Sequence, residues 1–116
     1  MKSRNERLFL ADIQECCQKI ERFIIGISES DFQTNEILKD ALVRNIEIIG
    51  EAAKNLSEQT RSENPGIPWR DVMRMRDKIV HHYFRLKLEI IWRTITEDIP
   101  ALQLQINEML EKYDER

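Results

Sequence analysis

Apolar residues recur along this chain at spacings of three and four positions, the period of one face of an α-helix. Four such stripes follow one another: Phe9, Ile13, Cys16, Ile20, Phe23 and Ile27; Leu38, Leu42, Ile49, Ala52 and Leu56; Trp69, Val72, Met73, Ile79 and Val80; and Leu88, Ile91, Ile95, Ile99, Leu102, Ile106 and Met109. Asn45 is a polar interruption of the second stripe, and no strand-like alternation of useful length is present. The pattern predicts an all-α fold, an antiparallel up-and-down four-helix bundle.

Turn-forming residues predict where these helices begin and end. The first helix should end near Gly26, and Ser30 with Gln33 has the capping-box spacing that opens the second. Residues 58–68 are rich in Ser, Asn, Gly and Pro and form the one clear loop, whose final proline suits the first turn of the third helix. Pro100 falls inside the fourth stripe and should bend or briefly break that helix.

The composition narrows the class of protein. A chain of 116 residues is most simply one domain, here residues 1–116. It has no apolar run long enough to span a membrane and no apolar segment of secretory length near its start, so we expect no membrane association and a cytoplasmic location. Cys16 and Cys17 are adjacent, which on a helix points them in different directions, so we expect two buried free thiols. Without further Cys, and with His only at 81 and 82, we expect no metal or other cofactor.

Charge is unevenly distributed. The net charge of −3 argues against broad, nonspecific nucleic-acid binding. From Arg70 to Arg93, however, seven Lys or Arg stand against three acids, a local +4, which leaves −7 for the rest of the chain. A basic centre on an acidic body attracts a phosphate-bearing ligand to one place, although by charge alone a solvated helix face with balanced pairs is the commoner explanation.

Some apolar positions lie outside the stripes. Trp92 is offset from the centre of the fourth stripe, and the adjacent Ile48 and Ile49 cannot both face one core. A homodimer interface and a broad core stripe explain these positions about equally well.

The segment Arg76–Tyr83 contains the residues best suited to catalysis. Arg76 offers a bidentate fork to phosphate oxygens, His81 can move a proton near neutral pH, and Tyr83 carries a modifiable hydroxyl. Such a set can cleave RNA without a metal: a base activates the ribose 2′-hydroxyl, an acid protonates the leaving 5′-oxygen, and a cation stabilises the charged intermediate. Asp77 is placed to orient Arg76 or His81. On these residues alone, a helix C-terminal cap with a packed phenol ring is the commoner explanation.

Helix geometry sets a condition on that chemistry. His81 is five residues from Arg76, about 140° around an undistorted helix, so one helix would not aim both at one atom. Either the helix frays near Tyr83 while the arginine swings round, or a second protomer completes the site.

A resemblance to a known family covers nearly the whole chain. The blocks that carry it are Arg44-Asn-Ile-Glu47-Ile-Ile-Gly-Glu51-Ala-Ala-Lys, Ile67-Pro-Trp and Met75-Arg76-Asp-Lys-Ile-Val-His81-His-Tyr83-Phe. They resemble the HepT family of minimal HEPN-domain proteins. The resemblance implies a dimerising helical bundle, with the Arg and His motifs of two protomers facing one cleft. It also implies a toxin that is a metal-independent endoribonuclease, and a partner that is a minimal, MntA-like nucleotidyltransferase antitoxin.

Carried over by position, the resemblance makes Arg76 and His81 catalytic and Tyr83 the residue that receives AMP. Adenylate on Tyr83 would place negative charge and bulk beside Arg76 and so block RNA. Glu47 and Glu51 are expected to be interface groups or groups that support the site, not catalysts.

Two other functions fit the same residues. In one, the chain is a noncatalytic nucleotide- or RNA-binding regulatory subunit of a nucleotidyltransferase, and Arg76 and His81 only bind the ligand. In the other it is a plain helical interaction module.

Overall fold

The computed structural model describes residues 4–115, and those residues form helices and turns without any strand. The elements are α1 (Arg4–Phe23), α2 (Glu29–Thr34), α3 (Glu36–Asn55), α4 (Glu58–Ser62), α5 (Trp69–His82), the 3₁₀ turn η1 (Tyr83–Arg85), α6 (Leu88–Arg93), the π turn η2 (Thr94–Asp98) and α7 (Ile99–Asp114). The all-helical class expected from the sequence is confirmed.

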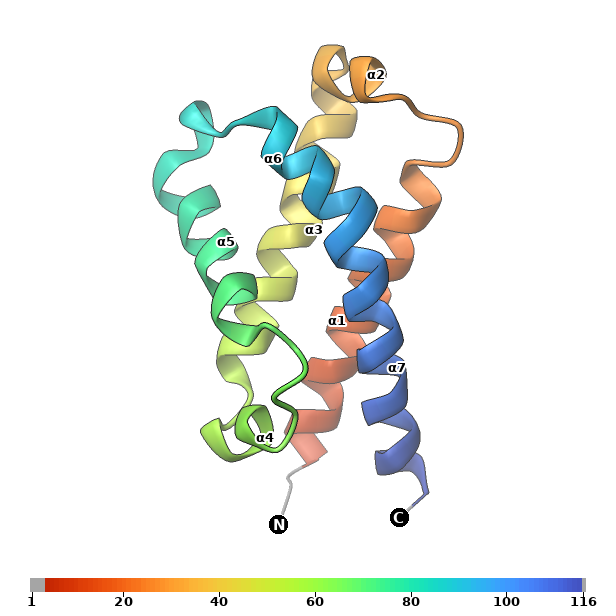
Figure 1. The fold of residues 1–116 in the computed structure, drawn as a ribbon, viewed down its shortest axis with the longest axis vertical. Helices are drawn as coiled ribbons and strands as arrows, with labels where there is room; N and C mark the ends of the chain where they lie inside the picture. The colour runs from red at the N-terminus through yellow and green to blue at the C-terminus, as the bar shows by residue number, and fades with distance from the viewer. Residues whose placement is uncertain (1–3, 116) are drawn as a thin grey trace.

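The long helices pack side by side along the molecule. α3 packs against α5 on one side and α1 on the other, and α7 packs against α1 (Figure 1). α6, η2 and α7 together form one helical rod (Figure 1). Its α6 end packs against α2, and its α7 end packs against α1. The fully buried side chains of Ile13, Ile20, Leu42, Ile49, Ile95 and Ile106 come from three of the expected stripes and meet in one core.

The turn between α1 and α3 differs from the sequence expectation. The prediction of a capping box at Ser30 and Gln33 is wrong, because Ser28 forms the box with Asp31 and starts the separate short helix α2. α3 then begins one residue after Asn35, whose side chain accepts the Leu38 backbone N–H at 3.0 Å. Aspartate fills the position where a glutamate or glutamine is usual, which hides this box from a motif search.

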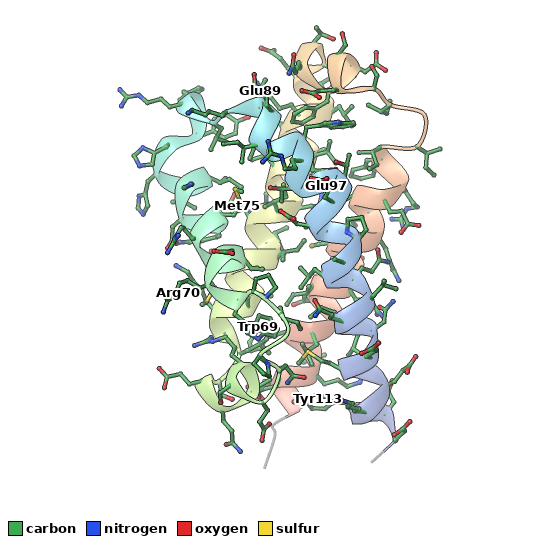
Figure 2. All side chains as sticks on the ribbon, viewed as in Figure 1. Trp69, Arg70, Met75, Glu89, Glu97 and Tyr113 are labelled. Atoms are coloured by element: carbon green, nitrogen blue, oxygen red, sulfur yellow. The ribbon has the colours of Figure 1, made fainter. Side chains whose placement is uncertain are left out.

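Segment 58–68 also differs, because it is not wholly loop. Ser57 caps the helix α4, and buried Glu6 of α1 accepts hydrogen bonds from the Ser57 backbone N–H at 2.6 Å and from the Thr60 hydroxyl. The Tyr113 hydroxyl of α7 also donates to Glu6, at 3.4 Å, and Tyr113 lies beside the start of α1 (Figure 2). One carboxylate therefore ties α1, α4 and α7 together.

Pro100 distorts the rod without breaking it. Pro100 has no N–H, and in a regular α-helix its ring would clash with a carbonyl one turn back. The chain widens into η2, where the Ile99 N–H donates to the Thr94 carbonyl five residues earlier. The Thr94 hydroxyl binds the Ile90 carbonyl at 3.0 Å and the Thr96 hydroxyl binds the Trp92 carbonyl at 2.9 Å. The helix therefore continues into α7.

The extra apolar positions are largely used within the chain. Trp92 is half-buried and its ring packs on the fully buried Phe32 of α2, with 5.4 Å between ring centroids. Ile49 is buried, and Ile48 packs half-buried against the same core. These contacts favour the broad core stripe as the explanation of the three residues, so they give no separate support to a dimer.

Candidate active site

The candidate site is built where α5 approaches α3 unusually closely, at Gly50. A Cβ atom added to Gly50 would lie 2.2 Å from the Arg76 Cβ, 3.0 Å from its Cγ and 3.2 Å from the Val72 carbonyl oxygen. Real Cβ atoms do not approach one another to 2.2 Å. The missing side chain of Gly50 therefore sets the distance between the helices, and the stem of Arg76 lies across the gap.

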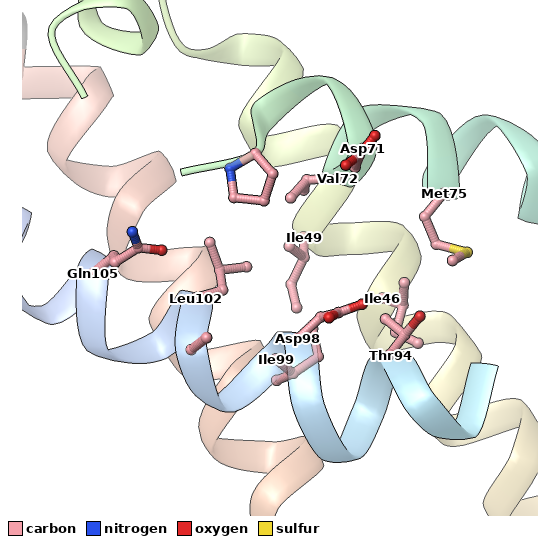
Figure 3. A pocket seen from close by; sticks show the side chains of 12 residues that line it. Ile46, Ile49, Asp71, Val72, Met75, Thr94, Asp98, Ile99, Leu102 and Gln105 are labelled. Atoms are coloured by element: carbon pink, nitrogen blue, oxygen red, sulfur yellow. The ribbon is translucent and has the colours of Figure 1, made fainter. Parts of the chain in front are cut away.

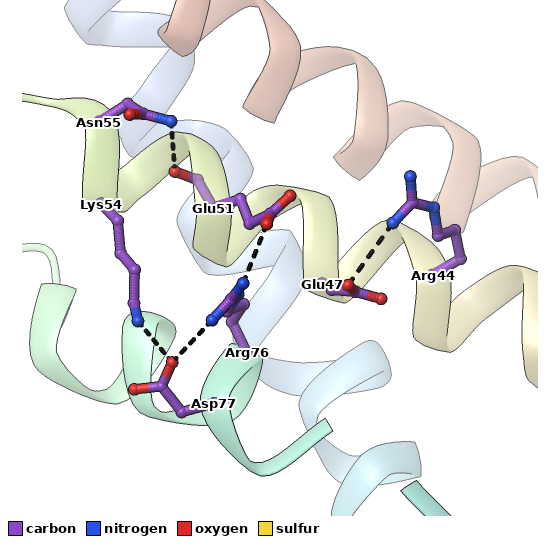
Figure 4. A network of polar contacts seen from close by, with 7 residues as sticks. All are labelled: Arg44, Glu47, Glu51, Lys54, Asn55, Arg76 and Asp77. Atoms are coloured by element: carbon purple, nitrogen blue, oxygen red, sulfur yellow. Dashed lines mark hydrogen bonds and ion pairs between the residues drawn. The ribbon is translucent and has the colours of Figure 1, made fainter. Parts of the chain in front are cut away.

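Arg76 then extends along α3 into a polar network (Figure 4). Its two terminal nitrogens donate to the Glu51 carboxylate at 3.0 Å and to the Asp77 carboxylate at 3.2 Å. Lys54, one turn further along α3, donates to the same oxygen of Asp77 at 2.5 Å. Two cations and two carboxylates thus form a network without net charge.

These contacts shift the proton equilibria of the network. The hydrogen bond to Glu51, followed by that to Asp77, raises the pKa of Arg76 further above its usual range. The hydrogen bond from Lys54, helped by that from Arg76, lowers the pKa of Asp77. The Arg76 side chain is only 22% exposed, and its buried Nε has no hydrogen-bond partner in the described part of the chain. Arg76 is therefore a fixed, permanently charged group with its fork held at the surface of α3.

His81 has a different environment. It is exposed in the last turn of α5, and its ring lies edge-on to that of His82 with 6.5 Å between centroids. Within residues 4–115 it forms no hydrogen bond to Arg76 or to any member of the network. A single chain thus brings Arg76, Glu51 and Asp77 together but leaves His81 apart.

The end of α5 places Tyr83 on another side. His82 leaves α-helical geometry (φ −136°, ψ 32°), and Tyr83 begins the 3₁₀ turn η1, so α5 does end near this residue. Fraying was one of the two alternatives, but Arg76 does not swing toward His81, because Glu51 and Asp77 hold its guanidinium. The Tyr83 hydroxyl donates to the Asp40 carboxylate of α3, and its ring meets that of Phe84 edge-on at 5.1 Å. Tyr83 lines a hollow of about 330 Å³ with Asp40 and Phe84 among its walls.

Sequence reasoning missed three residues of this region, Lys54, Asp40 and Gly50. It also assigned Glu47 to the site, whereas the structure places Glu47 outside the network. Lys54 and Asp40 are 23 and 43 positions from their partners Asp77 and Tyr83, so no spacing marks them. Gly50 carried a signal, because glycine inside a helical pattern often marks a close approach. Glu47 pairs with Arg44 at 3.5 Å on its own helix, one turn from the network (Figure 4).

A second concavity lies between α5 and the rod, over α3, with a volume of about 210 Å³. Its apolar walls include Ile49, Val72 and Leu102, and Asp71 and Asp98 face it from opposite sides (Figure 3). Burial, together with the negative charge of Glu97, raises the pKa of Asp98. Arg76, His81 and Tyr83, all in the described part of the chain, do not line this cleft.

Three further features concern metals, membranes and thiols. Among residues 4–115, no group of three or more His, Cys, Asp or Glu side chains is arranged to hold a metal ion. None of the helices in that range is long and apolar enough to cross a membrane. Cys16 and Cys17 are buried free thiols, as expected, and burial raises the pKa of Cys17 to about 12.

Comparison with known proteins now decides the family. Residues 13–109 match the family model described as "Ribonuclease HepT-like". The chain belongs to the HepT-like family. This HepT-like protein is 46% identical over 100 residues to the "Putative RNase TTE0752" of Caldanaerobacter subterraneus subsp. tengcongensis, a match that covers 86% of this chain and 88% of that one.

Two other relatives of this HepT-like chain are also named as ribonucleases. It is 41% identical over 100 residues to the "Probable ribonuclease HepT" of Thermococcus cleftensis, covering 86% of this chain and 91% of the relative. It is 30% identical to the "Putative RNase MJ0125" of Methanocaldococcus jannaschii over the full length of both chains. No solved structure matches the chain significantly.

Proposed function

We propose that this HepT-like protein is a metal-independent endoribonuclease, the toxin of a toxin–antitoxin pair. The observation that carries the proposal is the family match over residues 13–109, which includes the whole Arg76–Tyr83 motif. The geometry of Arg76 supports it, because a guanidinium fixed by two carboxylates is preorganised to stabilise charge on a phosphate. The bundle is proposed to act as a homodimer, with the motifs of two protomers facing one cleft.

The dimer accounts for the separation of Arg76 and His81 within one chain. His81 is exposed and forms no hydrogen bond in the described residues, so a second copy of the chain can approach it. One imidazole removes the proton of the ribose 2′-hydroxyl, whose oxygen attacks phosphorus. The other gives a proton to the departing 5′-oxygen, and the products are a 2′,3′-cyclic phosphate and a 5′-hydroxyl. Arg76 stabilises the negative charge that develops on the phosphate oxygens.

The regulation that we propose acts through Tyr83. A nucleotidyltransferase antitoxin transfers AMP from ATP to the tyrosine oxygen, releasing pyrophosphate. Tyr83 starts the turn directly after α5, so the added phosphate would repel RNA next to the motif. Modification would also break the hydrogen bond that Tyr83 donates to Asp40.

The decisive experiment is incubation of the purified protein with total RNA in excess chelator. Wild type should cleave, and Arg76→Ala and His81→Ala should lose cleavage while keeping the helical circular dichroism spectrum. The matched control is Arg74→Ala, which removes an exposed arginine from the same helix and should keep RNA cleavage. Equal nucleotide binding by all variants with no cleavage by any would instead support the regulatory-subunit function.

Assembly has its own test. Sedimentation should give a mass near twice 13.9 kDa, because the proposed cleft needs two copies. A clean monomer at micromolar concentration that still cleaves RNA would contradict the shared cleft.

A further inference from the structure

The charge balance of the Arg76 network raises the question of what attracts RNA to this acidic chain. Arg76 and Lys54 are each hydrogen-bonded to a carboxylate of Glu51 or Asp77, so the network offers no net positive charge. The chain as a whole carries −3. Binding of a polyanion therefore needs cations that are not already neutralised.

Such cations gather in a groove beside the motif, where α5, η1 and α6 meet. The groove has a volume of about 280 Å³, and its rim carries Lys78, Arg85 and Lys87. No carboxylate is among its lining residues, and none of the three cations forms an ion pair within residues 4–115. This is the arrangement expected for a surface that follows a phosphate backbone.

The apolar floor of the groove and its position next to His81 support RNA binding in addition to its charge. Met75, Leu86, Ile90 and Ile91 form an apolar floor, and Ile90 is 40% exposed. His82 lines the same groove and is the direct neighbour of His81, so a strand bound here would pass next to the catalytic imidazole.

An exposed aromatic ring stands beside the groove. Leu86 lines both the groove and the hollow that contains Tyr83, and Phe84 lies on the hollow side and is 96% exposed. Exposed rings next to basic residues are the platforms on which single-stranded bases stack.

We infer that this basic groove, defined by Lys78, Arg85 and Lys87, holds the phosphates of single-stranded RNA, and that Phe84 stacks on one of its bases. The inference rests on the proposed ribonuclease function for its biological meaning, but the binding itself does not need cleavage. It assigns roles to four residues other than Arg76, His81 and Tyr83.

The experiment measures binding and cleavage separately. Binding is followed by fluorescence anisotropy of a labelled 12-nucleotide oligouridylate, with full-length protein carrying His81→Ala so that the probe stays intact. The groove variant in that background is Lys78→Gln, Arg85→Gln and Lys87→Gln. Its matched control removes the same charge from distant surfaces of α1 and α7 through Lys19→Gln, Arg22→Gln and Lys112→Gln.

The two parts of the surface should give different signatures. Each phosphate contact on a single strand contributes about 0.7 to the slope of log affinity against log salt, so the groove variant should have a slope shallower by about 2. Phe84→Ala should weaken binding about fivefold or more while leaving the slope unchanged, because stacking is not electrostatic. The control triple variant should bind nearly as well as the His81→Ala parent.

The outcomes separate this inference from the proposed function. Equal loss of affinity in the groove and control variants, or no loss in either, overturns the groove. A groove variant that binds RNA normally but no longer sediments as a dimer overturns it as well and makes the surface a protein interface. If the groove signature appears while the protein with His81 intact cleaves no RNA in chelator, the groove stands and the ribonuclease proposal fails.

Discussion

Replacing Gly50 by alanine tests the idea that one absent side chain sets the position of Arg76. The new Cβ would lie 2.2 Å from the Arg76 Cβ, whereas carbon atoms in contact are about 3.5–4.0 Å apart. Both atoms sit at the root of their side chains, so a rotamer change cannot separate them. α5 must move away from α3 by roughly 1.5 Å, the difference between the two distances.

The expected stability change combines two opposing effects. Overpacking of a tight contact costs about 1–3 kcal/mol. Alanine is about 1 kcal/mol better than glycine inside a helix, which offsets part of that cost. We expect a net loss of about 0–2 kcal/mol in the free energy of unfolding, so the fold should survive. RNA cleavage should nevertheless fall strongly, because a shift on the order of 1 Å in a catalytic group can lower the rate about a hundredfold.

Urea unfolding and RNA cleavage in chelator together test this expectation. The matched control is Gly66→Ala, whose added Cβ would be in ordinary contact with Gln105 at 3.4 Å and should leave both measurements nearly unchanged. If Gly50→Ala were more stable than wild type by the full helix-propensity gain and fully active, the close approach would not control the site.

Three other predictions follow from the same structure. Hydrogen bonds from Thr60 and Ser57 lower the pKa of Glu6, although burial alone would raise it. Glu6→Ala should therefore cost about 1–3 kcal/mol of unfolding free energy at pH 7, measured in urea. Because the folded pKa is below the ordinary 4.5, wild type should lose this contribution as the pH falls through and below that value. Tyr83→Phe should keep RNA cleavage but take up no AMP from the nucleotidyltransferase, as intact-mass spectrometry can check; AMP on another residue would contradict the assignment. Cys17, with its pKa raised to about 12 by burial, should react with a thiol reagent at pH 8 only after unfolding.

The sequence predicted the helices better than their ends. Periodicity located the long helices because burial of one face is a local, repeating requirement. The sequence analysis missed the capping box at Ser28 because Asp31 occupies the position where glutamate or glutamine is usual. α4 escaped because its five residues are too few to show a period, and Glu6, which fixes its start, is 51 positions from Ser57.

The candidate site was predictable in its residue types but not in its partners. Chemistry and resemblance pointed to Arg76, His81 and Tyr83, and the helix argument showed that Arg76 and His81 do not converge in one undistorted helix. The contacts of Arg76 with Glu51 and of Tyr83 with Asp40 join helices that are distant in sequence. Those pairs depend on how α5 lies on α3, which no single-helix pattern contains.

The π turn before Pro100 also limits how the length of this chain can change. Its wider geometry makes room for one residue more than an α-helical turn would hold, between the buried face of α6 and that of α7. Deleting a residue from Thr94–Asp98 would remove that extra residue, so the π turn would close into an α-helical turn and the Pro100 ring would meet a carbonyl one turn back. Insertions and deletions should therefore be tolerated far less well here than in the turn around Gly26, even though both segments look like simple irregularities between helices.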